Sequence, residues 1–444
     1  MNRFLAGPLA GLALLAAAPA WAQEARRIDT GDTAWMLTAA VLVLRMTVPG
    51  LAFFYGGMVH KKNILAVMAQ SFVLCALMTV LWIVVGYSLV FGDGNAVIGD
   101  LSRVMLRGME VGWDQPFTLG AATANPLPLT IPEPAFMFYQ MTFFIITPAV
   151  ITGAFAERMK FSALLLLLSL WALLVYAPVA HWAWAPLGWL NLLGLADFAG
   201  GTVVEVNSGI AGLVCALVLG RRVGYGHDNM APHNLAYAVL GASLLWVGWL
   251  GFNSGAAGGA NGRAAMAIVA TQAAAAAATL AWLAVEWARH GKPTVLGAIS
   301  GAVAGLVAIT PAAGFVLPGA ALLIGGLAGF ICFWAVTELK RRLDYDDSLD
   351  AFGVHGVGGM LGTLLTGLLA YGPLSATEAV PEGLYAGGLG LLGVQALGVA
   401  GTIAWSGGVT WGLTLVVEAL VGLRVSEEAE RRGLDEVLHG ESLG

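Results

Sequence analysis

Long apolar stretches with almost no alternation of polar positions fill the chain between residues 33 and 423. A helix needs about 20 mostly apolar residues to cross the ~30 Å hydrocarbon core of a bilayer. Eleven stretches of roughly this length predict an all-α polytopic membrane protein with eleven transmembrane helices. We expect these spans at 33–55, 64–91, 135–156, 162–184, 197–219, 233–254, 264–287, 295–312, 317–338, 351–371 and 395–423.

The eighth and ninth spans are the least clearly separated, because residues 295–338 could also form one long helix. The sequence Pro-Ala-Ala-Gly at 311–314 favours two spans, since Pro and Gly interrupt helices. A single span would also put the basic loops 289–293 and 340–347 on opposite faces of the membrane. We therefore predict two helices here.

Lysine and arginine concentrate in alternate loops, five of which together hold eleven of these residues. The opposite loops hold only Arg103, Arg107 and Arg263. By the positive-inside rule the basic set faces the cytoplasm, so the N-terminus lies outside and the C-terminus is cytoplasmic in an inner (plasma) membrane. The basic loops are 60–63, 157–160, 221–229, 289–293 and 340–347.

The first 22 residues have the pattern of a secretory signal peptide. Arg3 precedes a short apolar stretch that ends in Ala20-Trp21-Ala22, a typical cleavage sequence. A first transmembrane helix is the alternative, but the apolar stretch is short. We predict a signal peptide at 1–22, a membrane domain at 23–423 and a cytoplasmic tail at 424–444.

The composition agrees with a membrane protein, because 58% of the residues are hydrophobic and only 11% are charged. A soluble domain has about 25% charged residues, so an ordinary soluble enzyme and a disordered chain are excluded. The net charge of −6 and the absence of a basic face argue against a nucleic-acid partner. The three cysteines, Cys75, Cys215 and Cys332, lie in apolar runs and predict neither a disulfide nor a metal site.

Ionisable residues inside the predicted spans are candidates for function, because a charge near the bilayer centre needs a partner or a cavity. Asp197 could cap the start of its helix, or it could be a buried anion near the outer mouth. Glu205 lies eight residues deeper, ~12 Å along the helix axis, where no cap explains it. The full set is Arg45, Asp197, Glu205, Glu286, His355 and Glu418.

Two spans share a pattern that predicts an inverted repeat. The fifth reads Glu205-x-x-x-Gly209-x-x-Gly212, and the tenth reads His355-x-x-x-Gly359-x-x-Gly362. The fifth span begins with Asp-Phe at 197–198, and the tenth begins with Asp-Ala-Phe at 350–352. Similar helices five spans apart indicate two five-span repeats of opposite orientation. Counting residues puts the carboxylate and the imidazole roughly 10 Å apart along the membrane normal.

Several long segments resemble the ammonium transporter family (Amt/Mep/Rh): 33–63, 152–165, 196–207, 231–255, 346–367 and the tail 421–442. The resemblance implies a channel-like transporter, not an enzyme, that binds no cofactor and imports ammonium for nitrogen uptake. It also implies a homotrimer with one narrow pore in each subunit. The tail implies regulation by a PII-type signal protein at the cytoplasmic face.

The resemblance also implies residue roles. Phe143 corresponds to the outer gate aromatic, Phe252 to the second gate phenylalanine and Trp184 to the tryptophan of the outer mouth. Asp197 corresponds to the buried aspartate below the recruitment site. His355 corresponds to one of two facing pore histidines.

Two positions depart from the family pattern. The other pore histidine is Glu205, an acid that some members also have, which makes the proton chemistry an open question. The position of a mouth serine is Ala256, which cannot accept a hydrogen bond from ammonium.

These residues predict a sequence of steps. Trp184 and Phe143 hold ammonium through cation–π contact, the ion loses a proton, and ammonia crosses an apolar pore past Glu205 and His355. The alternatives are an ammonium sensor with little transport and an Rh-like gas pore for carbon dioxide. An intramembrane metalloenzyme is disfavoured, because no further ligand cluster such as His-Glu-x-x-His accompanies the pair.

Overall fold

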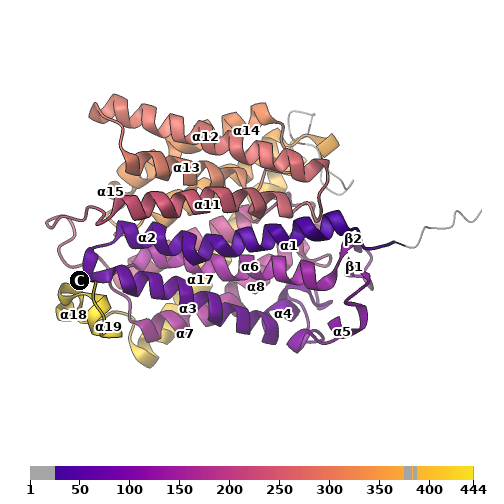
Figure 1. Ribbon diagram of the computed structural model, residues 1–444, viewed down its shortest axis with the longest axis horizontal. Coiled ribbons are helices and arrows are strands. Elements are labelled where there is room, and N and C mark those ends of the chain that lie inside the picture. The colour runs from indigo at the N-terminus through magenta and orange to yellow at the C-terminus, as the bar shows by residue number, and fades with distance from the viewer. Residues whose placement is uncertain (1–25, 375–382, 384–387, 444) are drawn as a thin grey trace, which may run out of the picture.

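The computed structural model describes residues 26–374, 383 and 388–443, so the predicted signal peptide lies outside the described residues. Long helices lie side by side with their axes along one direction (Figure 1). One end of this bundle carries the C-terminal segment, and we call it the tail face. The other end carries a two-stranded ribbon, and we call it the ribbon face.

The long helices are often composite, because π-helical turns interrupt regular α-helix. Their bounds are α1 (Thr30–Arg45), η1 (Met46–Leu51), α2 (Ala52–Met58), α3 (Ile64–Leu81), η3 (Trp82–Gly86), α4 (Tyr87–Phe91), α6 (Glu133–Ile151), α7 (Phe161–Trp171), η6 (Ala172–Tyr176), α8 (Ala177–Trp184), η7 (Gly201–Val206), α10 (Asn207–Leu219), α11 (Leu235–Gly255), α12 (Gly262–His290), α13 (Val295–Ile309), α14 (Pro318–Trp334), η8 (Ala335–Leu339), α15 (Lys340–Leu343), η9 (Phe352–Gly356), α16 (Val357–Leu369) and α17 (Gly390–Val421).

Shorter elements connect these helices or follow them. They are η2 (Lys61–Asn63), η4 (Val104–Leu106), α5 (Met109–Gly112), β1 (Pro116–Leu119), β2 (Leu127–Pro132), η5 (Thr152–Phe155), α9 (Trp189–Leu192), η10 (Gly372–Leu374), α18 (Glu427–Arg432) and α19 (Leu434–His439).

The predicted all-α membrane fold is confirmed. Within the described residues, ten helices are long and apolar enough to cross a membrane. The remaining predicted span, 295–312, corresponds to α13, an apolar helix of 15 residues. Residues 295–338 form two helices, α13 and α14, as the Pro-Ala-Ala-Gly break predicts.

The Pro-rich loop at 93–134 contains a two-stranded ribbon that the hydropathy pattern does not indicate. Within it, β1 pairs antiparallel with β2 at the ribbon face. The β2 strand leads directly into α6 at Glu133. Asp29, which caps α1, donates its backbone N–H to the carbonyl of Thr130 in β2 at 2.8 Å. The ribbon therefore ties the start of the first span to the start of the third.

The two repeated helices cross in close contact. A side chain at Gly209 would lie 2.2 Å from the backbone nitrogen of Gly356, and one at Gly359 would lie 2.7 Å from Cβ of Glu205. Gly209 therefore faces η9 of the other repeat, and Gly359 faces η7. This reciprocal contact is what a pseudo-two-fold axis between inverted repeats requires.

The predicted equivalence of Asp197 with Asp350 is wrong. Asp347 is the counterpart, because its carboxylate accepts the backbone N–H groups of Ala351 and Phe352, four and five residues on. Asp197 does the same at its own fourth and fifth following residues. Asp350 instead pairs with Lys340 at 2.7 Å. The shared Asp-Phe letters were misleading, since the spacing to the functional residue is eight in both repeats only from Asp347.

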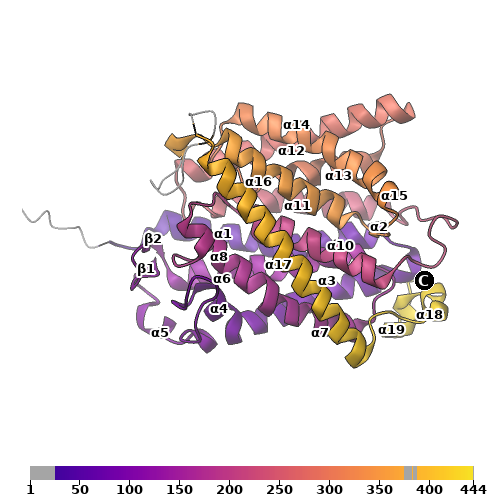
Figure 2. The same ribbon diagram turned by 180° about the vertical axis from the view of Figure 1, so that it is seen from behind.

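The C-terminal segment packs against the bundle. From the ribbon face, α17 crosses the back of the molecule diagonally to the tail face (Figure 2). There the carboxylate of Asp435 in α19 accepts the backbone N–H groups of Leu65 and Ala66 at 3.1 and 2.8 Å. These are unpaired donors in the first turn of α3. The tail therefore caps a membrane helix that lies about 370 residues earlier.

Candidate functional site

Two phenylalanine rings from different helices meet inside the bundle near the ribbon face. Phe143 of α6 and Phe252 of α11 have ring centroids 4.4 Å apart, and each is only 1% exposed. Trp184, the last residue of α8, contacts Phe143 edge-on with centroids 5.6 Å apart. We call Phe143 and Phe252 the phenylalanine pair. The three aromatic residues predicted to act together therefore form one cluster.

Asp197 lies directly beneath this cluster. Its backbone carbonyl accepts the indole N–H of Trp184 at 3.0 Å, and its carboxylate accepts N–H groups of Gly200, Thr202 and Val203 at 2.9, 2.9 and 3.2 Å. The side chain is 6% exposed. These bonds fit the capping interpretation, because Asp197 serves the unpaired donors at the start of η7.

Glu205 and His355 are in direct contact. The Oε2 atom of Glu205 lies 2.7 Å from Nδ1 of His355, and the two residues are 1% and 5% exposed. Each sits in a π-helical turn, η7 and η9, and such turns are frequent at functional sites. We call them the acid–imidazole pair. Residue counting leaves the two side chains within boundary error of each other in depth, and the structure brings them into hydrogen-bond contact.

A narrow cavity of about 10 Å³ lies between the phenylalanine pair and the acid–imidazole pair. This volume is close to the minimum that holds one water molecule. Its wall is apolar apart from Glu205, His355 and the indole N–H of Trp249, and that N–H is bonded to Thr310. The lining residues are Leu51, Phe54, Ile146, Val150, Val204, Glu205, Leu245, Trp249, Phe252, Val303 and His355.

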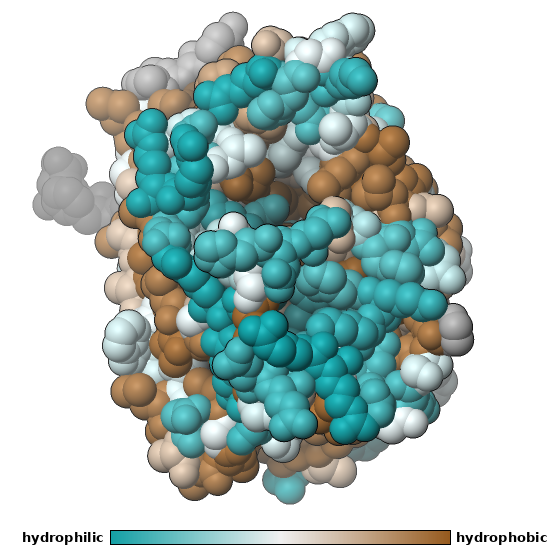
Figure 3. Space-filling view, turned by 90° about the vertical axis from the view of Figure 1, so that its left-hand side faces the viewer, coloured by the Kyte–Doolittle hydropathy of each residue, from teal (hydrophilic) through white to brown (hydrophobic). Residues whose placement is uncertain are grey.

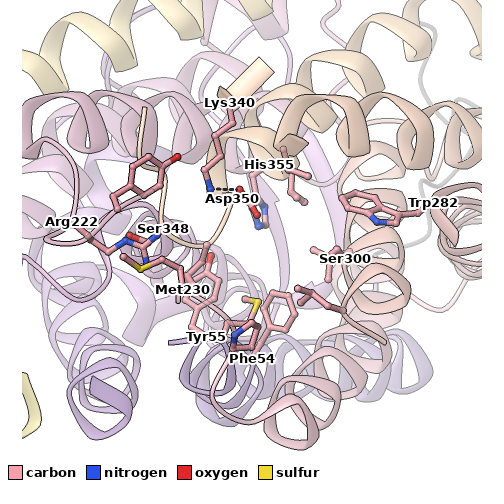
Figure 4. A pocket seen from close by; sticks show the side chains of 18 residues that line it. Phe54, Tyr55, Arg222, Met230, Trp282, Ser300, Lys340, Ser348, Asp350 and His355 are labelled. Atoms are coloured by element: carbon pink, nitrogen blue, oxygen red, sulfur yellow. Dashed lines mark hydrogen bonds and ion pairs between the residues drawn. The ribbon is translucent and has the colours of Figure 1, made fainter. Parts of the chain in front are cut away.

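A wider cavity of about 240 Å³ continues from His355 to the tail face. It shares Phe54, Val303 and His355 with the narrow cavity, so the two lie end to end. Figure 4 shows side chains converging on it from several elements, with Lys340 and Asp350 joined by an ion pair beside His355. The tail face around it is mostly hydrophilic and is visibly hollowed (Figure 3).

These features follow one another through the bundle, and we call this order the route. Trp184 and the phenylalanine pair come first from the ribbon face, then the narrow cavity with the acid–imidazole pair, and then the wide cavity. The narrow cavity is apolar apart from the groups named above, and the wide cavity includes the charged residues Arg222, Lys340 and Asp350.

Ala256 lies at the C-terminal cap of α11, four residues after Phe252, and is half-buried. It is thus one helical turn beyond the phenylalanine pair, at the ribbon end of α11.

Sequence reasoning missed other residues that line the route. Trp249 lies three residues before Phe252, and its ring contacts that phenylalanine with centroids 5.3 Å apart. The i, i+3 spacing on one helix is a signal that could have identified it. Phe54 and the Lys340–Asp350 ion pair had no such signal, since their neighbours are far away in the sequence.

Loops at the tail face carry a cluster of charged side chains outside the route. The Glu157 carboxylate accepts bonds from Nδ1 of His60 at 2.6 Å and from Nη1 of Arg222 at 2.7 Å. Burial by itself would raise the pKa of Glu157, but His60 and Arg222 lower it to about 2. The hydrogen bond to Glu157 raises the pKa of His60 above its usual value, although burial opposes this.

Comparison with known proteins gives the family. A sequence model of the Ammonium Transporter Family matches residues 34–443. The chain belongs to the ammonium transporter family. An ammonium transporter of Bacillus subtilis is 48% identical over 416 residues, which cover 93% of this chain and 98% of that protein. Membership of a transporter family agrees with the expectation that the protein is not an enzyme.

Solved structures of the family have the same fold. Mep2 of Candida albicans is 35% identical, with a TM-score of 0.82 over 90% of this chain and 88% of that one. A structure described as a sensor Amt protein is 29% identical, with a TM-score of 0.81 over 92% of this chain and 98% of that one. The chain is therefore a multi-pass membrane protein with the Amt/Mep fold.

Proposed function

We propose that this protein transports ammonium across the membrane by taking up the ion at the ribbon face and conducting ammonia through the narrow cavity. The observation that carries the proposal is the order of the route: an aromatic cluster, then an apolar cavity of one-molecule size, then a buried acid–imidazole pair. The family relatives named ammonium transporters support the substrate.

The aromatic cluster recruits the cation. The faces of Trp184 and Phe143 attract ammonium through their quadrupoles, an interaction worth about 0.5–2 kcal/mol. Potassium is attracted in the same way, so this step does not select between the two ions. Both carboxylate oxygens of Asp197 accept backbone N–H groups at the start of η7. Asp197 therefore supports the mouth through its negative charge and through the hydrogen bond from the Trp184 indole to its backbone carbonyl.

The narrow cavity makes the selection. An unpaired charge in an apolar space of this size loses its hydration without compensation. Ammonium avoids this cost by giving up a proton and entering as neutral ammonia, whereas potassium has no proton to lose. The cavity admits one small molecule at a time because it holds little more than one water.

The acid–imidazole pair gives ammonia hydrogen-bond partners halfway along the route. Oε2 of Glu205 lies 2.7 Å from Nδ1 of His355, and both residues line the narrow cavity. The hydrogen bond of 2.7 Å between Glu205 and His355 gives a proton a direct path from one side chain to the other. We therefore assign the pair a relay that carries the released proton toward the tail face.

Several further assignments follow from the family resemblance and the charge pattern. The signal peptide is removed after Ala22, the ribbon face lies outside and the tail face is cytoplasmic. The protein forms a homotrimer, and residues 424–444 form the surface that a PII-type protein contacts. Arg424 of this segment donates to Glu430 and to the carbonyl of Leu219, which joins tail and bundle.

The test is transport by purified protein in liposomes, recorded as current on a solid-supported membrane after an ammonium pulse. Native protein is expected to give a saturable ammonium current and almost no potassium current. Glu205→Gln is expected to reduce the ammonium current or its discrimination against potassium at least about tenfold, since a carboxamide cannot accept and release a proton as a carboxylate does.

Glu338→Gln is the matched control, because Glu338 pairs with Arg289 and Arg341 at the surface, away from the route. An ammonium sensor would bind the ion without current, and a carbon dioxide pore would respond to bicarbonate pulses. Either result, or unchanged behaviour of Glu205→Gln, contradicts the proposal.

A further inference from the structure

One side chain contacts both members of the phenylalanine pair. Tyr139 precedes Phe143 by one helical turn in α6, and its ring packs edge-on against that phenylalanine with centroids 5.0 Å apart. Its hydroxyl donates a hydrogen bond of 2.6 Å to the backbone carbonyl of Phe252 in α11. Tyr139 is 2% exposed, so neither contact competes with bulk water.

The acceptor of this bond is a carbonyl that the helix itself leaves open. Phe252 lies in the last turn of α11, where carbonyls lack the usual N–H donor four residues on. Each of the next three carbonyls, those of Asn253, Ser254 and Gly255, accepts the backbone N–H three residues further along the chain. The N–H of Ala256, which would reach Phe252 in a continuing helix, bonds to Asn253 and Ser254 instead.

The backbone of α11 is shaped to receive the tyrosine ring. A side chain at Gly255 would lie 2.5 Å from Cε2 of Tyr139 and 2.9 Å from its hydroxyl oxygen. Only glycine leaves this space, so α6 and α11 approach closely at the level of the phenylalanine pair. The tyrosine fills a slot in α11 and satisfies a buried acceptor there.

We propose that Tyr139 is a positioning residue for the phenylalanine pair. Its hydroxyl fixes the last turn of α11, and its ring fixes Phe143, so that the two phenylalanines stay 4.4 Å apart and keep hydrated ions out of the narrow cavity. This inference rests on the proposed function. The hydroxyl is committed to the Phe252 carbonyl and so acts through the two rings.

The experiment compares Tyr139→Phe with native protein in the current assay described above. The variant keeps the ring and removes only the hydroxyl, which leaves the Phe252 carbonyl without its donor. A hydrogen bond of ordinary net strength changes the population of the ordered arrangement about three- to tenfold. The ratio of potassium current to ammonium current is expected to rise by this factor.

The ratio is the informative readout, because both currents scale with the amount of folded protein. Tyr87→Phe is the matched control, since it removes another buried tyrosine hydroxyl, bonded to Glu133 at 2.7 Å and away from the phenylalanine pair. It is expected to keep the native ratio. Gly255→Ala is a second variant, which displaces the tyrosine ring and is expected to raise the ratio with the hydroxyl still present.

The outcomes separate this inference from the proposed function. A native protein without ammonium current contradicts the proposed function. A native protein that transports, together with native current ratios in Tyr139→Phe and Gly255→Ala, overturns the positioning role alone. If Tyr139→Phe does not accumulate in membranes, the ratio of Gly255→Ala decides. If the ratio rises in both Tyr139→Phe and Tyr87→Phe, the positioning role is also overturned, because the effect would then follow from the loss of any buried hydroxyl.

Discussion

Single residues set the chemistry of the route, and the residues that depart from the family pattern are the most informative. By the family resemblance, Glu205 corresponds to a histidine, and here it bonds His355 at 2.7 Å. By the same resemblance, Ala256 corresponds to a serine, one turn beyond the phenylalanine pair. The first change alters what the pair can do with a proton, and the second removes a hydrogen-bond acceptor from the mouth.

Restoring the mouth hydroxyl should strengthen uptake at low concentration. In Ala256→Ser, the hydroxyl accepts an ammonium N–H that is otherwise left to water, so the apparent KM should fall about two- to tenfold. The measurement is the concentration dependence of the ammonium current. Ala257→Ser is the neighbouring control and should keep the native KM. An unchanged KM in Ala256→Ser contradicts the proposed location of the recruitment site.

At the scale of elements, the two π-helical turns owe their contact to glycine. Gly209 faces the backbone of Gly356, and Gly359 faces Cβ of Glu205, so neither helix can approach the other if a side chain intervenes. The glycines explain why two ionisable residues can meet inside the bundle without distortion of the surrounding helices.

Alanine at the crossing should separate the repeats. Gly359→Ala places a methyl group 2.7 Å from Cβ of Glu205, and such overpacking costs about 1–3 kcal/mol. We expect a lower thermal unfolding temperature in detergent and loss of the ammonium current. Gly326→Ala in α14 is the control, because no atom lies within 4 Å of its added Cβ. Equal stability of the two variants contradicts a tight crossing.

The loops of the tail face respond to pH through His60 and Glu157. The lowered pKa of Glu157 gives a stabilising contribution that is full above about 4.5 and is lost as the pH falls toward about 2. The raised pKa of His60 gives a contribution that is full below 6.5 and is lost as the pH rises through the raised value. Both contributions to stability are therefore complete only between about pH 4.5 and pH 6.5.

The test is thermal unfolding in detergent across pH 5 to 9. Native protein should lose stability in the upper part of this window, and His60→Gln should flatten that loss because no imidazolium remains to pair with Glu157. His227→Gln, at an exposed position, should behave like native protein. Identical pH profiles for native protein and His60→Gln would show that the His60–Glu157 pair does not cause the loss of stability at high pH.

At the scale of the whole molecule, the C-terminal segment is part of the folded structure. Asp435 caps α3, and Lys62 donates to the carbonyls of Glu430 and Arg431 at 3.0 and 2.6 Å. Glu430 and Arg431 of this segment also line a pocket that shares Arg222 and Met230 with the wide cavity. The position of the segment links the tail to the end of the route without any contact inside the route.

Removal of the cap should release the tail. Asp435→Ala leaves two N–H groups of α3 unpaired, and loss of a cap costs about 0.5–2 kcal/mol. We expect faster proteolysis after residue 424 while the membrane domain stays intact on a gel. Glu441→Ala, at the exposed end of the tail, is the control. Equal cleavage rates of the two variants contradict the capping role.

The sequence by itself determined the membrane fold. Span positions, the break at 311–314 and the set of basic loops could be predicted because hydropathy and charge are properties of each residue and its near neighbours. Glu205 and His355 were also identifiable, since an ionisable side chain deep in an apolar span needs a partner wherever it lies.

Only the tertiary structure decided how these residues meet. It brought Glu205 and His355 into a hydrogen bond and Tyr139 to the carbonyl of Phe252. These contacts join residues as many as 150 positions apart. They depend on where helix backbones cross and on which glycines permit close approach, and a single helix does not specify its neighbours.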